Sequence, residues 1–465
     1  MILTRARQLF QSKFVQDTFI LQIGKVAVTL LSLFSTVLVT RLMGPHFYGI
    51  YALADSFYGV WKTLDLTGVS TSTNTRLGIA VGAGDEREIE NLMAFYVQIT
   101  MITTVGLALL LALFGASVAQ SVHGDASIGT MAALLALTGP GDAFYGLVVI
   151  SLQSRRLFRT LALLQNANQF VLTSSMITAV LINPTPMSLI LARLFYSYTT
   201  AIIAFAVYAN VRKQAVTLPP LALIMRRVPR LSPRPYLSFG FANALDKNIA
   251  NLYIEIPRQI IGILGGETAV GYVSLALRGL AQISVLTSAI FENMQAVVPQ
   301  LVGRGDYARL WRNFMRVLGV LALGGLAFYG LLALLAPMLI VPIFGNEWTP
   351  VIPVLVPLTL YGALTTVGGI FGPLYRAFGI MRAAVSIKLL TLVLVLPVGI
   401  VLMQSLSLNT DSFWGWSHFD LSATRVAIGG AWTINVLFLV SIALTMAITL
   451  PLLRRKAMAS DLKAK

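Results

Sequence analysis

The sequence of 465 residues contains no cysteine and only three histidines, which lie far apart at His46, His123 and His418. The absence of cysteine excludes disulfide bonds, thiol catalysis and cysteine metal sites, and three scattered histidines give no basis for a histidine metal site. Charged residues make up only 11% of the chain, whereas hydrophobic residues make up 57%. A soluble globular protein carries roughly twice that share of charge, so the composition predicts a membrane protein without a metal site.

Apolar runs of about twenty residues recur along the whole chain, and each is long enough to cross a bilayer as a helix. Backbone N–H and C=O groups must be satisfied inside the membrane, and the alternating pattern of a membrane β-barrel is missing. The sequence therefore predicts an all-α polytopic membrane protein with about twelve transmembrane helices. It contains no phosphate-binding loop and no other catalytic motif that stands out, which argues against an enzyme.

Basic residues are placed unevenly among the predicted loops. The 34 lysines and arginines outnumber the 18 acidic residues and give a net charge of +16. They cluster in every second loop, for example at 155–159 and 454–456, whereas only Arg41 is clearly basic on the other side. This positive-inside pattern predicts that both termini are cytoplasmic, and it accounts for the charge without a nucleic-acid partner. The acid-rich loop at 85–90 is the one cytoplasmic loop that departs from a positive balance.

The segment 211–237 is rich in proline and arginine and is the predicted cytoplasmic linker between two halves. It separates an N-terminal six-helix lobe, residues 1–210, from a C-terminal six-helix lobe with a short cytoplasmic tail, residues 238–465. Its middle, LALIMRR, is either a short helix on the inner leaflet, where basic residues meet anionic membrane lipids, or only a tether.

Several features recur at a spacing of 222 residues, which predicts an internal repeat. The recurring pairs are Lys25 with Lys247, Gly44 with Gly266 and Gly49 with Gly271. The dipeptide Gly84–Asp85 recurs one residue closer, as Gly305–Asp306. Because each half has an even number of spans, we expect the two lobes to be related by a pseudo-two-fold axis along the membrane normal. A lysine at the same depth of both halves suggests a central path for an anionic substrate.

Polar residues follow helical spacing on the first and seventh spans. One face of span 1 carries Lys25 and Thr29, and one face of span 7 carries Asn243, Lys247, Asn251, Glu255 and Arg258. Asp246 can neutralise Lys247, and Glu255 can pair with Arg258 three residues later. These residues either contact a substrate or form structural ion pairs that hold helices together.

Two further spans carry charges on one helical face. Span 2 has Asp55, Lys62 and Asp65, and span 8 has Arg278. Asp55 either binds a coupling ion or serves as a counter-ion for Lys62 or Lys247, and an arginine fork fits phosphate oxygens. Lys388 and Arg193 lie near span ends, where snorkelling to the head groups is expected. The role of Asp142 stays open.

Residues 39–51, VTRLMGPHFYGIY, resemble the R-x-L-G-P-x-x-Y-G-x-Y signature of bacterial oligosaccharide flippases, which belong to the multidrug/oligosaccharidyl-lipid/polysaccharide exporter (MOP) superfamily. The matching residues are Arg41, Gly44, Pro45, Tyr48, Gly49 and Tyr51, and Met43 stands where leucine is usual. The motif follows the first span, so its glycines and proline suit a turn and the start of a helix.

The resemblance implies a flippase that moves undecaprenyl-diphosphate-linked oligosaccharide from the cytoplasmic to the periplasmic leaflet by alternating access, for cell-surface polysaccharide biosynthesis. It further implies location in the bacterial inner membrane, and polysaccharide polymerase or assembly proteins as possible partners. The alternatives are a cation-coupled multidrug exporter of the same fold and a lipid II flippase.

Within this interpretation the substrate-binding candidates are Lys25, Lys247, Arg278, Arg258, Asn243, Asn251, Lys62 and Thr29. The candidates for coupling or counter-ion roles are Asp55, Asp65, Asp246 and Glu255. No cofactor is expected, and transport is expected to be coupled, if at all, to protons or Na⁺.

Overall fold

The computed structural model describes residues 13–155, 157–214, 218–233, 236, 241–284, 288–408 and 421–464, with side chains from Val28 onward except at a few positions within helices. Every regular element in this part of the chain is a helix. The predicted all-α class is therefore confirmed.

The described chain packs into two compact units. Unit 1 comprises Met1–Leu42 and Leu64–Ala244, and unit 2 comprises Met43–Thr63 and Leu245–Lys465. Helix α2 (Lys13–Lys62) contributes to both, because it breaks at Gly44. The lobe boundaries proposed from the sequence, 1–210 and 238–465, remain a prediction.

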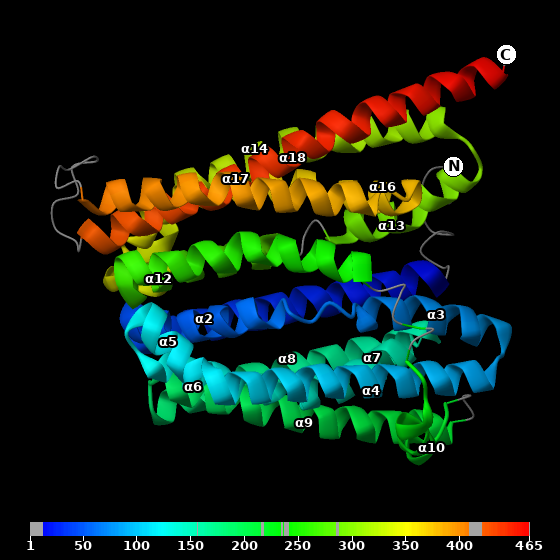
Figure 1. Cartoon of the computed structure of the whole chain (residues 1–465), viewed down its shortest axis with the longest axis horizontal. Coiled ribbons are helices and arrows are strands. Elements are labelled where there is room, and N and C mark those ends of the chain that lie inside the picture. The colour runs from blue at the N-terminus through cyan, green and yellow to red at the C-terminus, as the bar shows by residue number, and fades with distance from the viewer. Residues whose placement is uncertain are drawn as a thin grey trace. The chain divides into compact units, whose positions relative to one another are not determined.

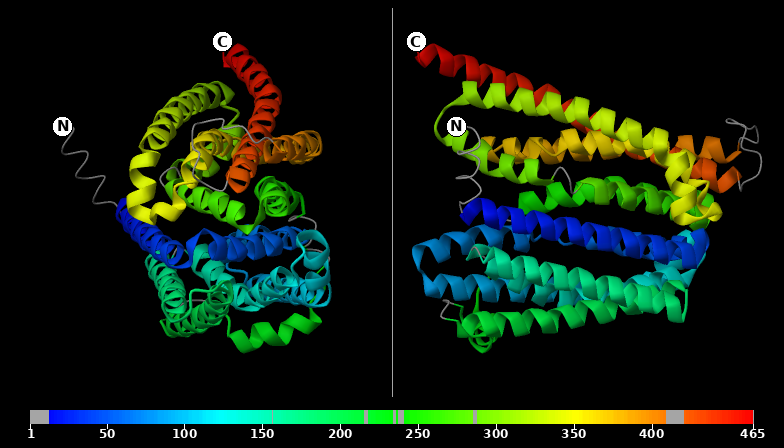
Figure 2. Two further views of the ribbon diagram at one scale, coloured as in Figure 1. Left: turned by 90° about the vertical axis from the view of Figure 1, so that its left-hand side faces the viewer. Right: turned by 180° about the vertical axis from the view of Figure 1, so that it is seen from behind.

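Unit 1 is a bundle of long helices that pack against one another. Figure 1 shows α4, α7, α8 and α9 running side by side, and Figure 2 shows the same from behind. Its helices are α3 (Val69–Ala83), α4 (Glu86–Leu110), a π-helical turn (Leu111–Gly115), α5 (Ala116–His123), α6 (Ala126–Ala136), α7 (Thr138–Ser154), α8 (Phe158–Ile182), α9 (Pro186–Lys213), α10 (Leu221–Arg227) and a 3₁₀ turn (Val228–Arg230).

Unit 2 is built in the same way, with α14, α17 and α18 side by side in Figure 1. Its helices are α12 (Phe241–Ser284), α13 (Ser288–Gly303), α14 (Tyr307–Phe344), a 3₁₀ turn (Asn346–Trp348), α15 (Val351–Gly368), α16 (Phe371–Phe378), α17 (Met381–Leu408) and α18 (Leu421–Ala464). Many large apolar side chains point outward, such as Leu334 with 78% of its surface exposed, as expected for a surface that faces lipid.

Nine stretches of the described helices are long and apolar enough to cross a membrane. Two of these stretches contain a break, at Gly44 and at Gly266, and each of the two therefore provides two spans. Helix α8 has 25 residues and is also long enough to span, at about 1.5 Å per residue. The described helices thus accommodate the predicted set of about twelve spans.

The internal repeat predicted from the sequence is visible in the backbone. Gly44 has φ 68° and ψ 173°, and Gly266, at the corresponding position, has φ 73° and ψ −177°. Only glycine adopts such a conformation without strain, which explains why both breaks occur at glycine.

The same correspondence holds at the next helix start in each half. Gly84 and Gly305 both have φ 70°. The side chain of the following aspartate then caps the next helix, since Asp85 Oδ1 accepts from Glu88 N at 3.0 Å and Asp306 Oδ1 accepts from Arg309 N at 3.1 Å. Capping of this kind satisfies a backbone donor that the first helical turn leaves open.

Within unit 2 the second arm of α2 (residues 45–62) runs antiparallel to α12. Gln259 Nε2 donates to Leu53 O at 3.3 Å, Ser56 Oγ donates to Glu255 O at 3.3 Å, and Asn248 Nδ2 donates to Thr63 O at 2.9 Å. The residue number of the partner on α12 falls as the residue number on α2 rises, so the two helices are antiparallel.

The closest approach of these helices is a reciprocal glycine contact. A Cβ at Gly49 would lie 1.8 Å from Glu267 O, and a Cβ at Gly271 would lie 2.3 Å from Pro45 O. Pro45 and Glu267 are themselves repeat partners, so each half makes the same contact with the other. Such reciprocity is the signature of a local two-fold relation between the two segments.

The predicted linker helix forms at the predicted residues, as α10, and packs against α4 within unit 1. Ile224 is fully buried, Arg227 forms an ion pair with Glu90, and Tyr236 Oη donates to Glu88 Oε2 at 3.1 Å. Burial, followed by the nearby Glu88 carboxylate, raises the pKa of Tyr236, which keeps its hydroxyl protonated as the donor. The acid-rich loop at 85–90 is thus the docking surface of the basic linker.

We expect Gly49→Ala and Gly271→Ala each to destabilise the protein, because the added methyl group overlaps a backbone carbonyl. Overpacking of this kind costs about 1–3 kcal/mol and should lower the melting temperature of the detergent-solubilised protein. Gly279→Ala, on the same helix with open space around the added carbon, is the matched control and should be neutral or slightly stabilising. Equal melting temperatures for all three variants would contradict the close contact.

Candidate functional site

The charged side chains of α12 divide into paired and exposed groups. Glu255 Oε2 accepts from Arg258 Nη1 at 3.1 Å, which confirms the pairing predicted from their spacing. Lys247 and Asn251 lie on the same face and are exposed. Among the described residues no side chain forms an ion pair or hydrogen bond with Lys247. In the described part of α12, this face therefore offers the exposed cation Lys247 next to the exposed amide of Asn251.

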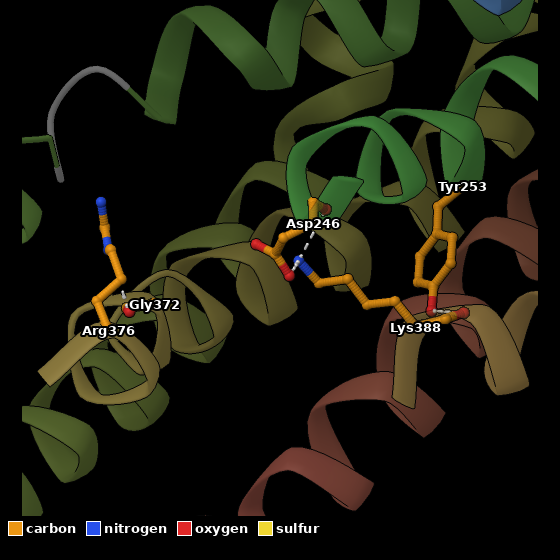
Figure 3. Close-up of polar contacts among 5 residues, drawn as sticks. All are labelled: Asp246, Tyr253, Gly372, Arg376 and Lys388. Atoms are coloured by element: carbon orange, nitrogen blue, oxygen red, sulfur yellow. Dashed lines mark hydrogen bonds and ion pairs between the residues drawn. The ribbon is translucent and has the colours of Figure 1, made fainter. Parts of the chain in front are cut away.

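The sequence suggested that Asp246 neutralises Lys247, but in the structure Asp246 pairs with a different lysine. Its Oδ1 accepts from Lys388 Nζ on α17 at 2.6 Å, and its backbone oxygen is 3.2 Å from the same Nζ (Figure 3). Adjacent residues on a helix point in different directions, so Asp246 and Lys247 cannot face each other. Lys388, for which snorkelling was expected, is instead held in this pair.

Tyr253 supports the same junction. Its Oη donates to Lys388 O at 2.7 Å (Figure 3). Its ring also packs edge-on against Phe438 at 5.4 Å between centroids. Asp246 and Lys388 keep only 25% and 21% of their side-chain surfaces exposed. This ion pair therefore joins α12 to α17 as a structural contact, and it leaves Lys247 without its nearest acid.

A second exposed cation lies close to Lys247 in the fold. Lys62, at the end of α2, is exposed and stacks over the Tyr58 ring at 5.6 Å. The residue after Lys62 is Thr63, whose carbonyl accepts from Asn248, the residue after Lys247. The two lysines thus flank one hydrogen bond between α2 and α12. We call Lys62, Lys247 and Asn251 the basic patch.

Arg278 belongs to a different environment of unit 2. Its Nη1 donates to Tyr48 Oη at 3.4 Å, and the Asp55 carboxylate attracts the guanidinium electrostatically. Tyr48 in turn packs edge-on against the buried Trp348 at 5.7 Å. Tyr48 of the family-like motif thus belongs to a packed junction with Arg278, and the charge nearest to Asp55 in this junction is Arg278 rather than the lysines considered from the sequence.

The remaining predicted site residues either make contacts within their own segment or have side chains outside the described residues. Asp65 Oδ1 accepts from Thr67 N at 3.1 Å and from Thr67 Oγ1 at 2.6 Å, which stabilises the turn between α2 and α3. Thr29 is half-buried in the first arm of α2. Lys25 and Asn243 lie in helices, but their side chains fall outside the described residues.

Unit 1 holds a polar cluster that the sequence analysis missed. Tyr196 Oη on α9 donates to Asn168 Oδ1 on α8 at 3.0 Å, and Ser197 Oγ donates to Asp142 Oδ1 on α7 at 2.7 Å. The signal that could have revealed it is the run QNANQ at 165–169, which places four amides in the middle of a predicted span. Amides are uncharged, so the pattern of charged residues alone does not reveal this run.

The fold matches solved transporters over almost its whole length. A MOP superfamily transporter from Pyrococcus furiosus, described as having a binding pocket of reverse polarity, is 14% identical, with a TM-score of 0.65 and 96% of each chain covered. An inward-facing multidrug resistance MATE family transporter is 14% identical, with a TM-score of 0.64 and 96% of each chain covered. The eukaryotic MATE transporter AtDTX14 is 14% identical, with a TM-score of 0.63 and coverage of 98% of this chain and 100% of that one.

The family model described as "Polysaccharide biosynthesis protein" matches residues 38–353. The chain belongs to this polysaccharide biosynthesis family. No curated protein sequence matches the chain. Family and fold together make it a multi-pass membrane transporter of the MOP superfamily. The match includes the motif at 41–51, the reciprocal glycine contact and the basic patch of this family member.

A double-mutant cycle should test the Asp246–Lys388 pair. Asp246→Asn and Lys388→Met each leave one charge unpaired within the membrane-spanning region, so each should lower the melting temperature. The double variant should recover part of the loss, with a coupling of about 0.5–3 kcal/mol.

Arg376→Met is the control for this cycle, because Arg376 Nε donates only to Gly372 O of its own helix, at 3.3 Å (Figure 3). Its effect should add to that of Asp246→Asn without coupling. Additivity of Asp246→Asn with Lys388→Met would show that the pair does not form in the membrane.

Proposed function

We propose that this protein is a flippase for undecaprenyl-diphosphate-linked oligosaccharide, which it carries from the cytoplasmic to the periplasmic leaflet by alternating access. Membership of a polysaccharide biosynthesis family supports a sugar-containing cargo. The transporter fold supports movement across the membrane rather than catalysis. The observation that carries the proposal is the basic patch, with Lys247 exposed and its neighbouring acid held by Lys388.

A diphosphate is the chemical group that the basic patch fits best. Two exposed lysines from different helices lie next in sequence to the two residues of the Asn248–Thr63 hydrogen bond, so their backbones are close together in unit 2. Ammonium groups form short charge-assisted hydrogen bonds with phosphate oxygens. Exposed cations in spanning helices are costly unless an anion or water contacts them. An anionic cargo therefore provides the counter-charge for the lysines of the basic patch.

The same observation argues against one of the two alternatives, the cation exporter. A cation exporter requires acidic groups free to bind its cargo, whereas Asp246 and Glu255 are already paired with Lys388 and Arg258. A lipid II flippase shares the diphosphate and differs in the sugar, so defined substrates must separate it from the proposed function.

The setting of the proposed activity is the bacterial inner membrane, with both termini in the cytoplasm. Protons or Na⁺ are the proposed source of coupling energy, with Asp55 and Asp65 as the nominated acids, and no cofactor is required. Polysaccharide polymerase or assembly proteins, together with membrane lipids, are the proposed partners.

We expect Lys62→Gln and Lys247→Gln each to reduce flipping of lipid-linked oligosaccharide in proteoliposomes by at least about tenfold, the effect of losing roughly 1.4 kcal/mol of interaction. Lys→Arg at the same sites should retain more activity, because charge is kept. The control is Lys213→Gln, an exposed cation at the end of α9, which should flip normally. Normal flux in both glutamine variants would refute the diphosphate assignment.

Reporter fusions should place the turns around Gly84 and Gly305 in the cytoplasm, and the turn around Gly345 outside it. These positions follow from the arginine distribution and from the alternation of successive spans. The measurement is alkaline phosphatase and fluorescent-protein activity of fusions at each turn. A high phosphatase signal at Gly305 would overturn the proposed orientation.

A further inference from the structure

Helix α8 of unit 1 carries an unusual density of amides for a membrane span. Gln165, Asn166, Asn168 and Gln169 occur within five residues. Gln165 lies seven residues after Phe158, the first residue of α8, or about 10 Å along the axis at 1.5 Å per residue. The amides therefore lie well inside the membrane, where polar side chains mark substrate pathways or contacts between helices.

Three of the four amides, Gln165, Asn168 and Gln169, lie away from the lipid-facing side of α8, whereas Asn166 lies about 60° from Leu163, at the border of that side. Leu163, Phe170 and Leu181 are 71%, 62% and 65% exposed. They are seven and eleven residues apart, spacings that place them on one face of a helix. Gln165 is also exposed and lies about 160° around the helix from Leu163, at about 100° per residue. An exposed amide on the side opposite the apolar face requires water or a polar ligand.

Neighbouring helices continue this polar surface. Tyr196 on α9 donates to Asn168 at 3.0 Å and is also influenced electrostatically by Asp142 on α7. Asp142 is exposed between the buried residues Gly141 and Ala143, in the middle of the apolar stretch Ala126–Ser154. A carboxylate in this position cannot face lipid without a large cost. Three helices of unit 1 thus present acid, amide and phenol groups together.

Part of this surface has unused hydrogen-bonding capacity. Asn168 is bonded to Tyr196, and Gln169 Nε2 donates to Thr173 Oγ1 at 3.3 Å. Within the described part of the chain, neither Gln165 nor Asn166 has a hydrogen-bond partner. Each amide offers two donors and an acceptor, a set that matches sugar hydroxyls, which both donate and accept.

We propose that this surface, formed by Gln165, Asn168, Gln169, Asp142 and Tyr196, binds the saccharide part of the lipid-linked substrate. The inference rests on the proposed flippase function and adds a sugar-recognising element to it. The bonded amides, Asn168 and Gln169, position the surface, and the exposed, unbonded Gln165 contacts the ligand. Unit 1 then recognises the sugar through hydrogen bonds, whereas the diphosphate is recognised through charge.

The test compares two ligands that differ only in the sugar. The full-length protein in detergent is titrated with undecaprenyl diphosphate alone, and with undecaprenyl-diphosphate-linked oligosaccharide extracted from the producing cells. Gln165→Leu removes the two donors and the acceptor of this amide and should weaken binding of the oligosaccharide ligand by at least about tenfold. Its affinity for undecaprenyl diphosphate and its melting temperature should not change.

Two controls separate ligand binding from structure. Gln98→Leu removes an amide of α4 that donates to Leu231 O at 3.3 Å, so it should lower stability without changing the ratio of the two affinities. Lys247→Gln should weaken both ligands alike. Equal loss for both ligands, or no loss, in Gln165→Leu overturns the saccharide site alone. Failure of the wild-type protein to bind either ligand overturns the flippase proposal and the saccharide site together.

Discussion

The cost of placing a polar side chain inside a bilayer governs this structure, because every such group must be paired or wetted. The protein uses both solutions within short distances. Asp246 and Lys388 are paired across two helices, and Glu255 and Arg258 are paired along one. Lys247 and Gln165 are exposed instead. The paired groups bind helices to one another, and the exposed groups identify the surfaces at which water and cargo must enter.

The internal repeat explains how α2 and α12 are placed against one another in unit 2. A glycine break recurs at Gly44 and Gly266 with nearly the same backbone angles, and the glycines five residues later meet each other directly. Because the two copies contact each other through equivalent atoms, the same requirement for glycine applies on both sides of the junction. Any side chain larger than hydrogen at Gly49 or Gly271 would separate α2 from α12, and with it Lys62 from Lys247.

Features that depend on spacing along one helix were predictable from the sequence. The repeat of 222 residues anticipated both glycine breaks, and the i,i+3 spacing anticipated the Glu255–Arg258 pair. The Asp246–Lys388 pair joins residues 142 positions apart, and no local pattern specifies which lysine an acid will reach. The α8 amides were overlooked for another reason: amides carry no charge, so the cost of burying them is smaller and their signal weaker.

The acid-rich loop at 85–90 shows how charge bias and packing act together. Loops that stay in the cytoplasm normally carry an excess of arginine and lysine, and acids contribute little to this bias. Here Glu90 pairs with Arg227 and Glu88 accepts from Tyr236, so the acids bind the basic linker. The Arg227–Glu90 ion pair and the complete burial of Ile224 together fix α10 to α4. The described part of the linker is therefore packed into unit 1, and its arginines contribute to packing as well as to the charge bias of the sequence.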